Sequence, residues 1–98
     1  MKVEYHIIFA DEVQIDINKS KEWYNNQQKD LGERFVKDVK STIKRIVKNP
    51  QLFTIKYQKV RTANCSVFPF AVHFELDEIN TVIRVAAVFH FSRKPYWE

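Results

Sequence analysis

The sequence predicts an α+β fold of two layers, in which a helical hairpin packs on a mostly antiparallel sheet in the order β-α-α-β-β-β. Three observations support this prediction. A short apolar strand comes first, two segments with helical spacing of apolar residues follow it, and segments with alternating apolar residues complete the chain. A length of 98 residues corresponds to one domain, 1–98, with a modest core.

The first predicted strand covers residues 5–9, and the acidic pair Asp11-Glu12 after it suits the first turn of a helix. Two apolar residues of this helix, Ile15 and Trp23, fall outside its apolar face and must pack elsewhere or remain partly exposed. The apolar face itself comprises Ala10, Val13, Ile17 and Tyr24.

The only glycine, Gly32, lies between the two helical segments, where a tight turn needs a residue free of Cβ constraints. It predicts an antiparallel helical hairpin. The second helix ends at Asn49-Pro50, because the residue before a proline disfavours helical geometry. The apolar arc of this helix comprises Phe35, Val36, Val39, Ile43, Ile46 and Val47.

Residues 53–57 alternate as a strand, and the apolar phase changes before Val60, which indicates a bulge or turn near Gln58-Lys59. Two longer strands follow, joined by the polar residues 77–80. In each of them, large apolar residues recur with a period of two. They are Phe68, Phe70, Val72, Phe74 and Leu76 in the first strand, and Ile83, Val85, Ala87, Phe89 and Phe91 in the second.

The intervening positions of these two strands share the other face of the sheet. That face should therefore collect His73, Arg84 and His90, away from the bulky hydrocarbon. A basic and aromatic tail, 92–97, follows the last strand. If the protein has a site, this face and the tail are the first place to look.

Positive charge is concentrated in the middle of the chain. The net charge is +4, yet residues 34–61 contain nine basic side chains and a single acid, Asp38, so this segment carries +8 and the rest −4. Such a stripe attracts polyanions or an acidic protein partner at long range, although most basic helix faces are simply solvated. The basic residues are Arg34, Lys37, Lys40, Lys44, Arg45, Lys48, Lys56, Lys59 and Arg61.

Several classes of site receive little support. A single cysteine, Cys65, cannot form an internal disulfide, which is consistent with a reducing compartment, and a small half-buried residue is a better interpretation of it than a nucleophile. The three histidines are scattered and share no ligand spacing with cysteine or carboxylate, so no metal is expected. One glycine cannot build a phosphate-cradling loop, so no cofactor is expected. The apolar run 7–10 is too short for a membrane span or a signal-peptide core, which favours a cytoplasmic protein without membrane association.

Motifs along nearly the whole chain resemble those of a known family. In order, they are Trp23-Tyr24, Leu31-Gly32-Glu33-Arg34-Phe35, Ile46 with Asn49-Pro50 and Phe53, Val60-Arg61, Phe68-Pro69-Phe70, Ala87-Val88-Phe89-His90, Arg93-x-Pro95 and Trp97. Taken together, they resemble the RelE/ParE superfamily of toxins from bacterial type II toxin-antitoxin systems, and most closely its plasmid-stabilisation, ParE-like branch. The resemblance implies a cognate antitoxin as partner, in a toxin-antitoxin hetero-oligomer, and a homodimer is also possible.

Nuclease members of this superfamily cleave mRNA on the ribosome without a metal, by attack of a ribose 2′-hydroxyl on the adjacent phosphate. If this chain is such a nuclease, the resemblance implies His90, Arg61 and Tyr96 as the catalytic residues, with His90 the best acid or base. The candidates for nucleic-acid or target binding are Arg84, Arg93, Lys94, Trp97, Lys56 and Lys59.

Each of these candidates also has a structural interpretation. His90 can be a satisfied histidine at a strand end, Arg84 a partner of Glu75 across the hairpin, and Trp97 a plug over the sheet edge. The nuclease pattern is also incomplete, since the arginine common near 68–70 and the tyrosine common at 91 are replaced by hydrocarbon side chains. Whether the chain is an enzyme therefore stays open.

Three functions are compatible with the sequence. The first is a ParE-like toxin that arrests growth by binding DNA gyrase or another replication protein, with Trp23 and the tail residues 93–97 as contacts. The second is a RelE-like, ribosome-dependent and metal-independent mRNA endoribonuclease. The third is an inactive relic that only binds its antitoxin. The ParE-like function ranks first, because the chain departs less from that branch.

Overall fold

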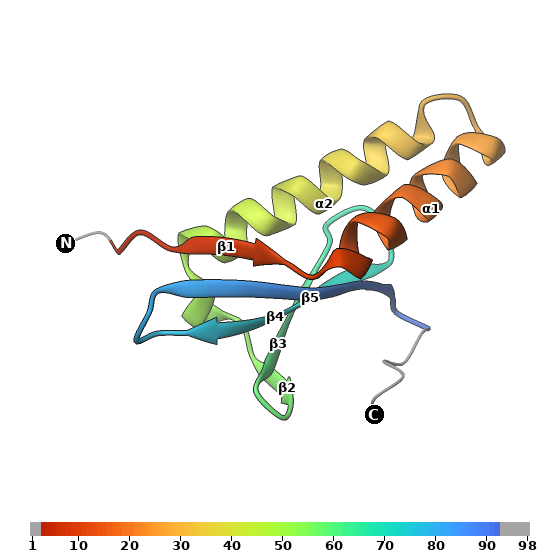
Figure 1. The fold of residues 1–98 in the computed structure, drawn as a ribbon. Coiled ribbons are helices and arrows are strands. Elements are labelled where there is room, and N and C mark those ends of the chain that lie inside the picture. Colours follow the sequence, from red (N-terminus) through yellow and green to blue (C-terminus); the bar gives the residue numbers. More distant parts are fainter. Residues whose placement is uncertain (1–2, 93–98) are drawn as a thin grey trace.

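The computed structural model describes residues 3–92 and contains two long helices and five strands. Figure 1 shows the two helices as a hairpin above one side of the sheet. The helices are α1 (Asp11–Gln27) and α2 (Leu31–Lys48), followed by a short 3₁₀ helix at Pro50–Leu52. The strands are β1 (His6–Phe9), β2 (Ile55–Tyr57), β3 (Val60–Asn64), β4 (Phe70–Asp77) and β5 (Val82–His90).

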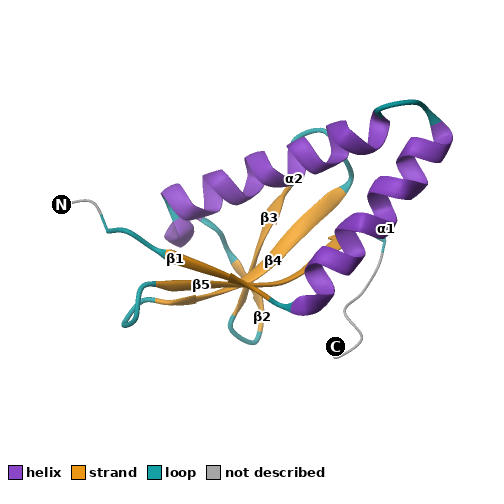
Figure 2. Ribbon diagram, turned by 45° about the horizontal axis from the view of Figure 1, so that its top comes forward, coloured by secondary structure: helices purple, strands orange, loops and turns teal. Residues whose placement is uncertain are grey.

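The five strands form one sheet in the order β1-β5-β4-β3-β2. All neighbours run antiparallel except β1 and β5, which are parallel. Both helices lie in one layer on a single side of this sheet (Figure 2). The predicted α+β fold of two layers is therefore confirmed.

The sheet has one strand more than the predicted element order. The chain turns between Tyr57 and Val60, where Gln58 adopts a left-handed conformation with φ of 48°. This turn was expected near Gln58-Lys59, and it separates β2 from β3 as a hairpin. Phe53 lies before β2 and packs against the core instead of extending the strand.

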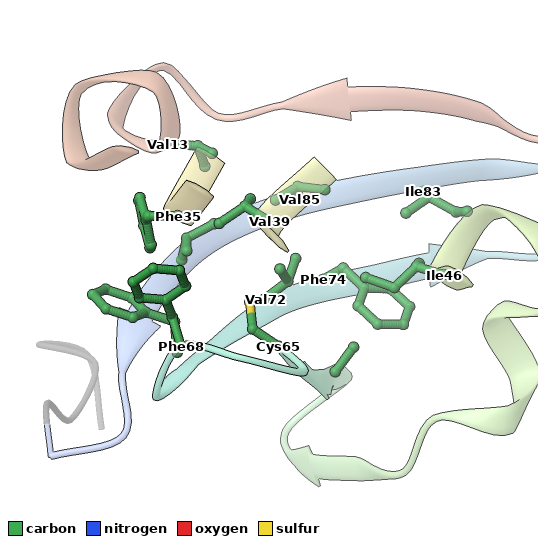
Figure 3. Close-up of a cluster of buried hydrophobic side chains, with 13 residues drawn as sticks. Val13, Phe35, Val39, Ile46, Cys65, Phe68, Val72, Phe74, Ile83 and Val85 are labelled. Atoms are coloured by element: carbon green, nitrogen blue, oxygen red, sulfur yellow. The ribbon is translucent and has the colours of Figure 1, made fainter. Parts of the chain in front are cut away.

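The core lies between the helix layer and the sheet. Figure 3 shows helix residues such as Val13, Phe35 and Val39 facing strand residues such as Phe74 and Val85. All five are at most 1% exposed. Each such side chain contributes about 1.5–3 kcal/mol relative to an exposed one, so this interface supplies the main driving force for the fold. The predicted apolar faces of both helices are thereby confirmed.

Gly32 has a different role from the predicted one. The left-handed residue of the helix-to-helix turn is Asp30, with φ of 64°, whereas Gly32 lies inside α2. A Cβ at Gly32 would lie 2.2 Å from the carbonyl oxygen of Lys21 and 2.7 Å from the side chain of Asn25. The Gly32 N–H also donates a 2.7 Å hydrogen bond to Asn25 Oδ1. Glycine is required here because the two helices approach closely, and the turn itself does not need it.

We expect Gly32→Ala to lower the free energy of unfolding by about 1–3 kcal/mol, because overpacking against α1 outweighs the better helix propensity of alanine. Urea denaturation followed by circular dichroism measures this change. Lys44→Ala, at an exposed position of α2, is the control and should change stability by less than about 0.5 kcal/mol. A stabilised Gly32→Ala protein would contradict the close approach of the helices.

Cys65 is buried, with 8% of its surface exposed, and burial raises the pKa of its thiol above the ordinary value. Only the thiolate reacts with disulfide reagents, so the folded protein should react with such a reagent at pH 8 at least about tenfold more slowly than the urea-unfolded protein. The folded protein favours the protonated thiol of Cys65 because its pKa is raised there. The stability that this thiol contributes is therefore present at low pH and is lost as the pH rises through the folded pKa. Equal reaction rates in the two states would show that the thiol is accessible.

Candidate functional site

A β-bulge in the pairing of β4 with β5 determines on which side of the sheet the last side chains of β5 lie. His73 pairs with Ala87, but the next residue of β4, Phe74, pairs with Val85. Ala86 is therefore an extra residue in β5. Because side chains alternate with a period of two, one extra residue exchanges the two faces for the rest of the strand.

The exchange of faces corrects the predicted pattern along β5. Val88 belongs to the core beneath the helices, where Ala87 and Phe89 were expected. Those two residues are buried on the opposite face, and the Phe89 ring lies 5.2 Å from the ring of His73. The alternation holds up to Val85 and reverses beyond the bulge.

His90 is consequently not on the face that was predicted for it. Its ring lies 5.3 Å from Phe70 in an edge arrangement, on the helix side of the sheet. His73 and Arg84 lie on the other face, as expected, where Arg84 is directly opposite Glu75. The prediction that all three share one face, away from hydrocarbon, is wrong for His90, because the bulge separates it from the other two.

The bulge places His90 at the rim of an open hollow between α1 and the ends of β4 and β5. The hollow has a volume of about 310 Å³. Its wall is largely aromatic, and its lining also includes one imidazole and two serine hydroxyl groups. The lining residues are Ser20, Trp23, Tyr24, Phe70, His90 and Ser92.

Two consecutive aromatic residues of α1 form one wall of this hollow. Trp23 is 59% exposed and meets Tyr24 edge-on, with 5.1 Å between ring centroids. Tyr24 in turn packs edge-on against Phe68 at 4.8 Å, and burial raises the pKa of its phenol. Trp23 is thus a large aromatic side chain held at the surface by a buried aromatic cluster, an arrangement that suits a contact residue.

The hydrogen bonds of His90 determine which ring nitrogen carries the proton. The backbone N–H of Ser92 donates to Nδ1 at 3.1 Å, and the Ser92 hydroxyl lies 2.8 Å from the same nitrogen. A backbone N–H can only donate, so Nδ1 is an acceptor and the neutral ring carries its hydrogen on Nε2. Neutral His90 therefore offers a hydrogen-bond donor at Nε2.

The loop before β4 is held by a buried carboxylate on α2. Asp38 is 7% exposed and accepts hydrogen bonds from the backbone N–H groups of Ser66, Val67 and Phe68, at 3.2, 3.0 and 2.7 Å. These bonds satisfy both carboxylate oxygens and pin the loop against α2. The loop in turn carries Phe68 into the core and delivers Phe70 to the hollow.

Arg61 lies far from His90. Arg61 pairs with Phe74, whereas His90 pairs with Phe70, four residues away on β4. This offset corresponds to about 13 Å along the strand, with about two strand spacings, ~10 Å, across the sheet. The Arg61 guanidinium donates a 2.8 Å hydrogen bond to the carbonyl oxygen of Phe53. The structure does not bring together Arg61 and His90, two of the three residues proposed for catalysis.

The remaining candidates are dispersed. Arg84 is exposed on the face without helices, and Lys56 and Lys59 are exposed on the β2–β3 hairpin. Four candidates lie outside the described residues: Arg93, Lys94, Tyr96 and Trp97.

Sequence reasoning missed three residues that shape the hollow. Ser20 and Ser92 line it, and Asp38 fixes the loop that forms its wall. The lone acid in a basic segment was a usable signal for Asp38, because an isolated carboxylate on a cationic helix often has a specific partner. Nothing comparable in the sequence distinguishes the two serines.

Residues 3–92 offer neither a metal site nor a membrane-spanning helix. Over this range, histidine, cysteine and carboxylate side chains do not gather in groups of three that could hold a metal ion. Neither α1 nor α2 is long and apolar enough to cross a bilayer.

Comparison with known proteins relates this arrangement to solved structures. The toxin-antitoxin system ParDE from the chromosome of P. aeruginosa matches with a TM-score of 0.77 and 13% identity, over 89% of this chain and 96% of that chain. The RelBE2 toxin-antitoxin complex from Mycobacterium tuberculosis matches with a TM-score of 0.67 and 15% identity, over 90% of this chain and 99% of the other. A search of curated proteins gave no significant match.

The chain accordingly shares its fold with these two solved structures. The sequence model of the family described as the ParE toxin of the type II toxin-antitoxin system parDE matches residues 7–95. The chain belongs to this family of ParE toxins, which confirms the resemblance seen in the sequence.

We expect Asp38→Asn to lower the free energy of unfolding by about 2–4 kcal/mol. The asparagine amide has a single acceptor oxygen, so it cannot replace both carboxylate oxygens that accept from the three N–H groups. Chemical denaturation measures the loss. Glu22→Gln, which neutralises an exposed carboxylate on α1, is the matched control and should cost less than about 0.5 kcal/mol. Similar small effects of both substitutions would show that the Asp38 carboxylate does not hold the loop.

Proposed function

We propose that this ParE-family toxin arrests growth by binding a replication protein, DNA gyrase, through the aromatic hollow and the exposed Trp23 beside it. The observation that carries the proposal is the contrast between two features of the described residues. The cationic and imidazole groups suggested for RNA cleavage do not converge, whereas a largely aromatic surface does form. Aromatic anchors of this kind dominate the energetics of protein–protein interfaces.

Two features argue against RNA cleavage as the activity of the hollow. Phosphoryl transfer to a neighbouring hydroxyl needs a base, an acid and positive charge around one phosphate. Within residues 3–92, His90 supplies the one imidazole that lines the hollow, and no arginine, lysine or carboxylate lines it. Hydrocarbon side chains at 68–70 and at Phe91 also stand where nuclease relatives commonly carry an arginine and a tyrosine.

Trp23 is the residue on which the proposed contact depends most. Its ring is exposed and preorganised by Tyr24, so little conformational entropy is lost when a partner covers it. The Nε2–H of His90 and the hydroxyls of Ser20 and Ser92 supply hydrogen bonds at the rim. Such a surface has an apolar centre and a polar edge, as recognition sites on proteins commonly do.

The proposed partner that neutralises the toxin is a cognate antitoxin. The two solved structures compared above come from toxin-antitoxin systems, and the family is described by such a system. An antitoxin that covers the hollow would block the proposed contact with gyrase.

Expression of the wild-type chain should arrest growth, co-expression of the neighbouring antitoxin gene should relieve it, and the purified toxin should inhibit supercoiling by gyrase. Trp23→Ala should weaken that inhibition about thirtyfold or more, since truncation of a hot-spot residue costs about 2 kcal/mol or more. Ile15→Ala is the control, because Ile15 is a similarly exposed apolar residue of α1 outside the hollow, 53% exposed against 59% for Trp23. It should inhibit gyrase like the wild type.

His90→Ala separates the proposed activity from RNA cleavage. If ribosomes with the wild-type toxin cleave mRNA and folded His90→Ala protein does not, the toxin is a nuclease and the gyrase proposal is wrong. If neither gyrase inhibition nor mRNA cleavage occurs and only the antitoxin binds, the chain is an inactive relic.

A further inference from the structure

The outer face of α2 carries a row of lysines that the proposed hollow does not use. The row consists of four lysines between residues 37 and 48. A helix turns by about 100° per residue, so the four lie within an arc of about 80° around the helix axis. All four are exposed, and they point away from the side of α2 that buries Phe35, Val39 and Ile46. We call this surface the lysine face of α2; it comprises Lys37, Lys40, Lys44 and Lys48.

One carboxylate, that of Glu33, lies within the arc of this face, and it pairs with Lys21 of α1 rather than with a lysine of the face. In the part of the chain that the structure describes, the one ion pair is Lys21–Glu33, at 3.8 Å. Asp38, the single acid among residues 34–61, is buried and occupied by three backbone N–H groups. The lysine face therefore presents four ammonium groups without a partner ion, which produces a positive potential along the helix.

We propose that the lysine face of α2 binds the phosphate backbone of duplex DNA, independently of base sequence. From Lys37 to Lys48 the helix rises by about 16 Å, and each strand of a duplex presents a phosphate about every 3.4 Å along its axis. Four ammonium groups in a nearly straight row can thus each reach a phosphate of one rigid duplex. Lysine binds phosphate as a point charge and does not read base edges in the bidentate manner of arginine.

Other polyanions fit this face less well. Proteins that bind single-stranded nucleic acid stack its bases on aromatic side chains, and α2 exposes no aromatic residue. An acidic protein segment would require exposed apolar anchors among the charges for a stable contact, yet the other α2 residue inside the lysine arc is Glu33, and the bordering Val36 and Val47 are half-buried. The proposal does not depend on gyrase, because it concerns a different surface and a ligand that can be tested alone.

Fluorescence anisotropy with a labelled 20-base-pair duplex and the purified toxin tests the proposal. Four phosphate contacts predict that log K falls against log salt with a slope of about −3.6. The dissociation constant should then rise on the order of 100-fold between 50 and 200 mM salt. Changing the base sequence of the duplex should leave the affinity unchanged.

A pair of double variants with the same net charge identifies the surface. Lys40→Gln with Lys44→Gln should reduce the magnitude of the salt slope by about two, because two phosphate contacts are removed. Lys19→Gln with Lys29→Gln removes two exposed lysines outside this face and should retain the wild-type slope. All four substituted lysines are exposed, and circular dichroism verifies that both double variants are folded.

Four results would overturn the proposal. They are the absence of duplex binding at 50 mM salt, an equal loss of slope in both double variants, tighter binding of single-stranded RNA than of duplex DNA, and equal competition by an acidic peptide of matched charge. The third would assign the face to RNA, and the fourth to an acidic protein such as an antitoxin. Gyrase inhibition by the Lys40→Gln, Lys44→Gln variant, measured in parallel, keeps a failure here distinct from a failure of the proposed target.

Discussion

The contact between the Asp38 carboxylate and the loop before β4 is the constraint on which the arrangement of the site depends. An ionised carboxylate is costly to bury unless its oxygens are satisfied, and here three successive backbone N–H groups satisfy them. The same bonds supply partners for backbone donors that no strand pairing satisfies. Although α2 contributes nothing to the lining of the hollow, it fixes Phe70 in the wall through this loop. The architecture of the site is thus determined one layer away from it.

Most of the fold could be predicted because its helices and strands have clear periodicity. The apolar arc of α2 and the turn at Gln58 follow from local patterns, and the structure has both. Gly32 shows where such reasoning ends. Its position suggested a turn, but the need for glycine arises from a close approach to Lys21 on another helix. That approach is tertiary, and no property of neighbouring residues encodes it.

The candidate site was harder to predict than the fold. Val85, Ala86, Ala87 and Val88 are all apolar, so either phase of alternation suits them, and the bulge that moves His90 leaves no trace in the sequence. The resemblance to a family indicated His90 as a residue of interest, and the alternation of the strand placed it beside charged groups. In the structure its neighbours are Phe70 and Ser92. His90 therefore offers a hydrogen-bond donor at an aromatic surface and does not lie among cationic side chains.

The parallel pairing of β1 with β5 joins the two ends of the chain within one sheet. The hollow likewise needs α1 from the first third of the sequence and β5 from the last. Contacts between such distant segments form late, because the intervening loop must first be closed. A nascent chain on the ribosome therefore lacks the hollow until β5 has left the exit tunnel. A growing chain therefore cannot present the surface that we propose for target binding until β5 has been added to the fold.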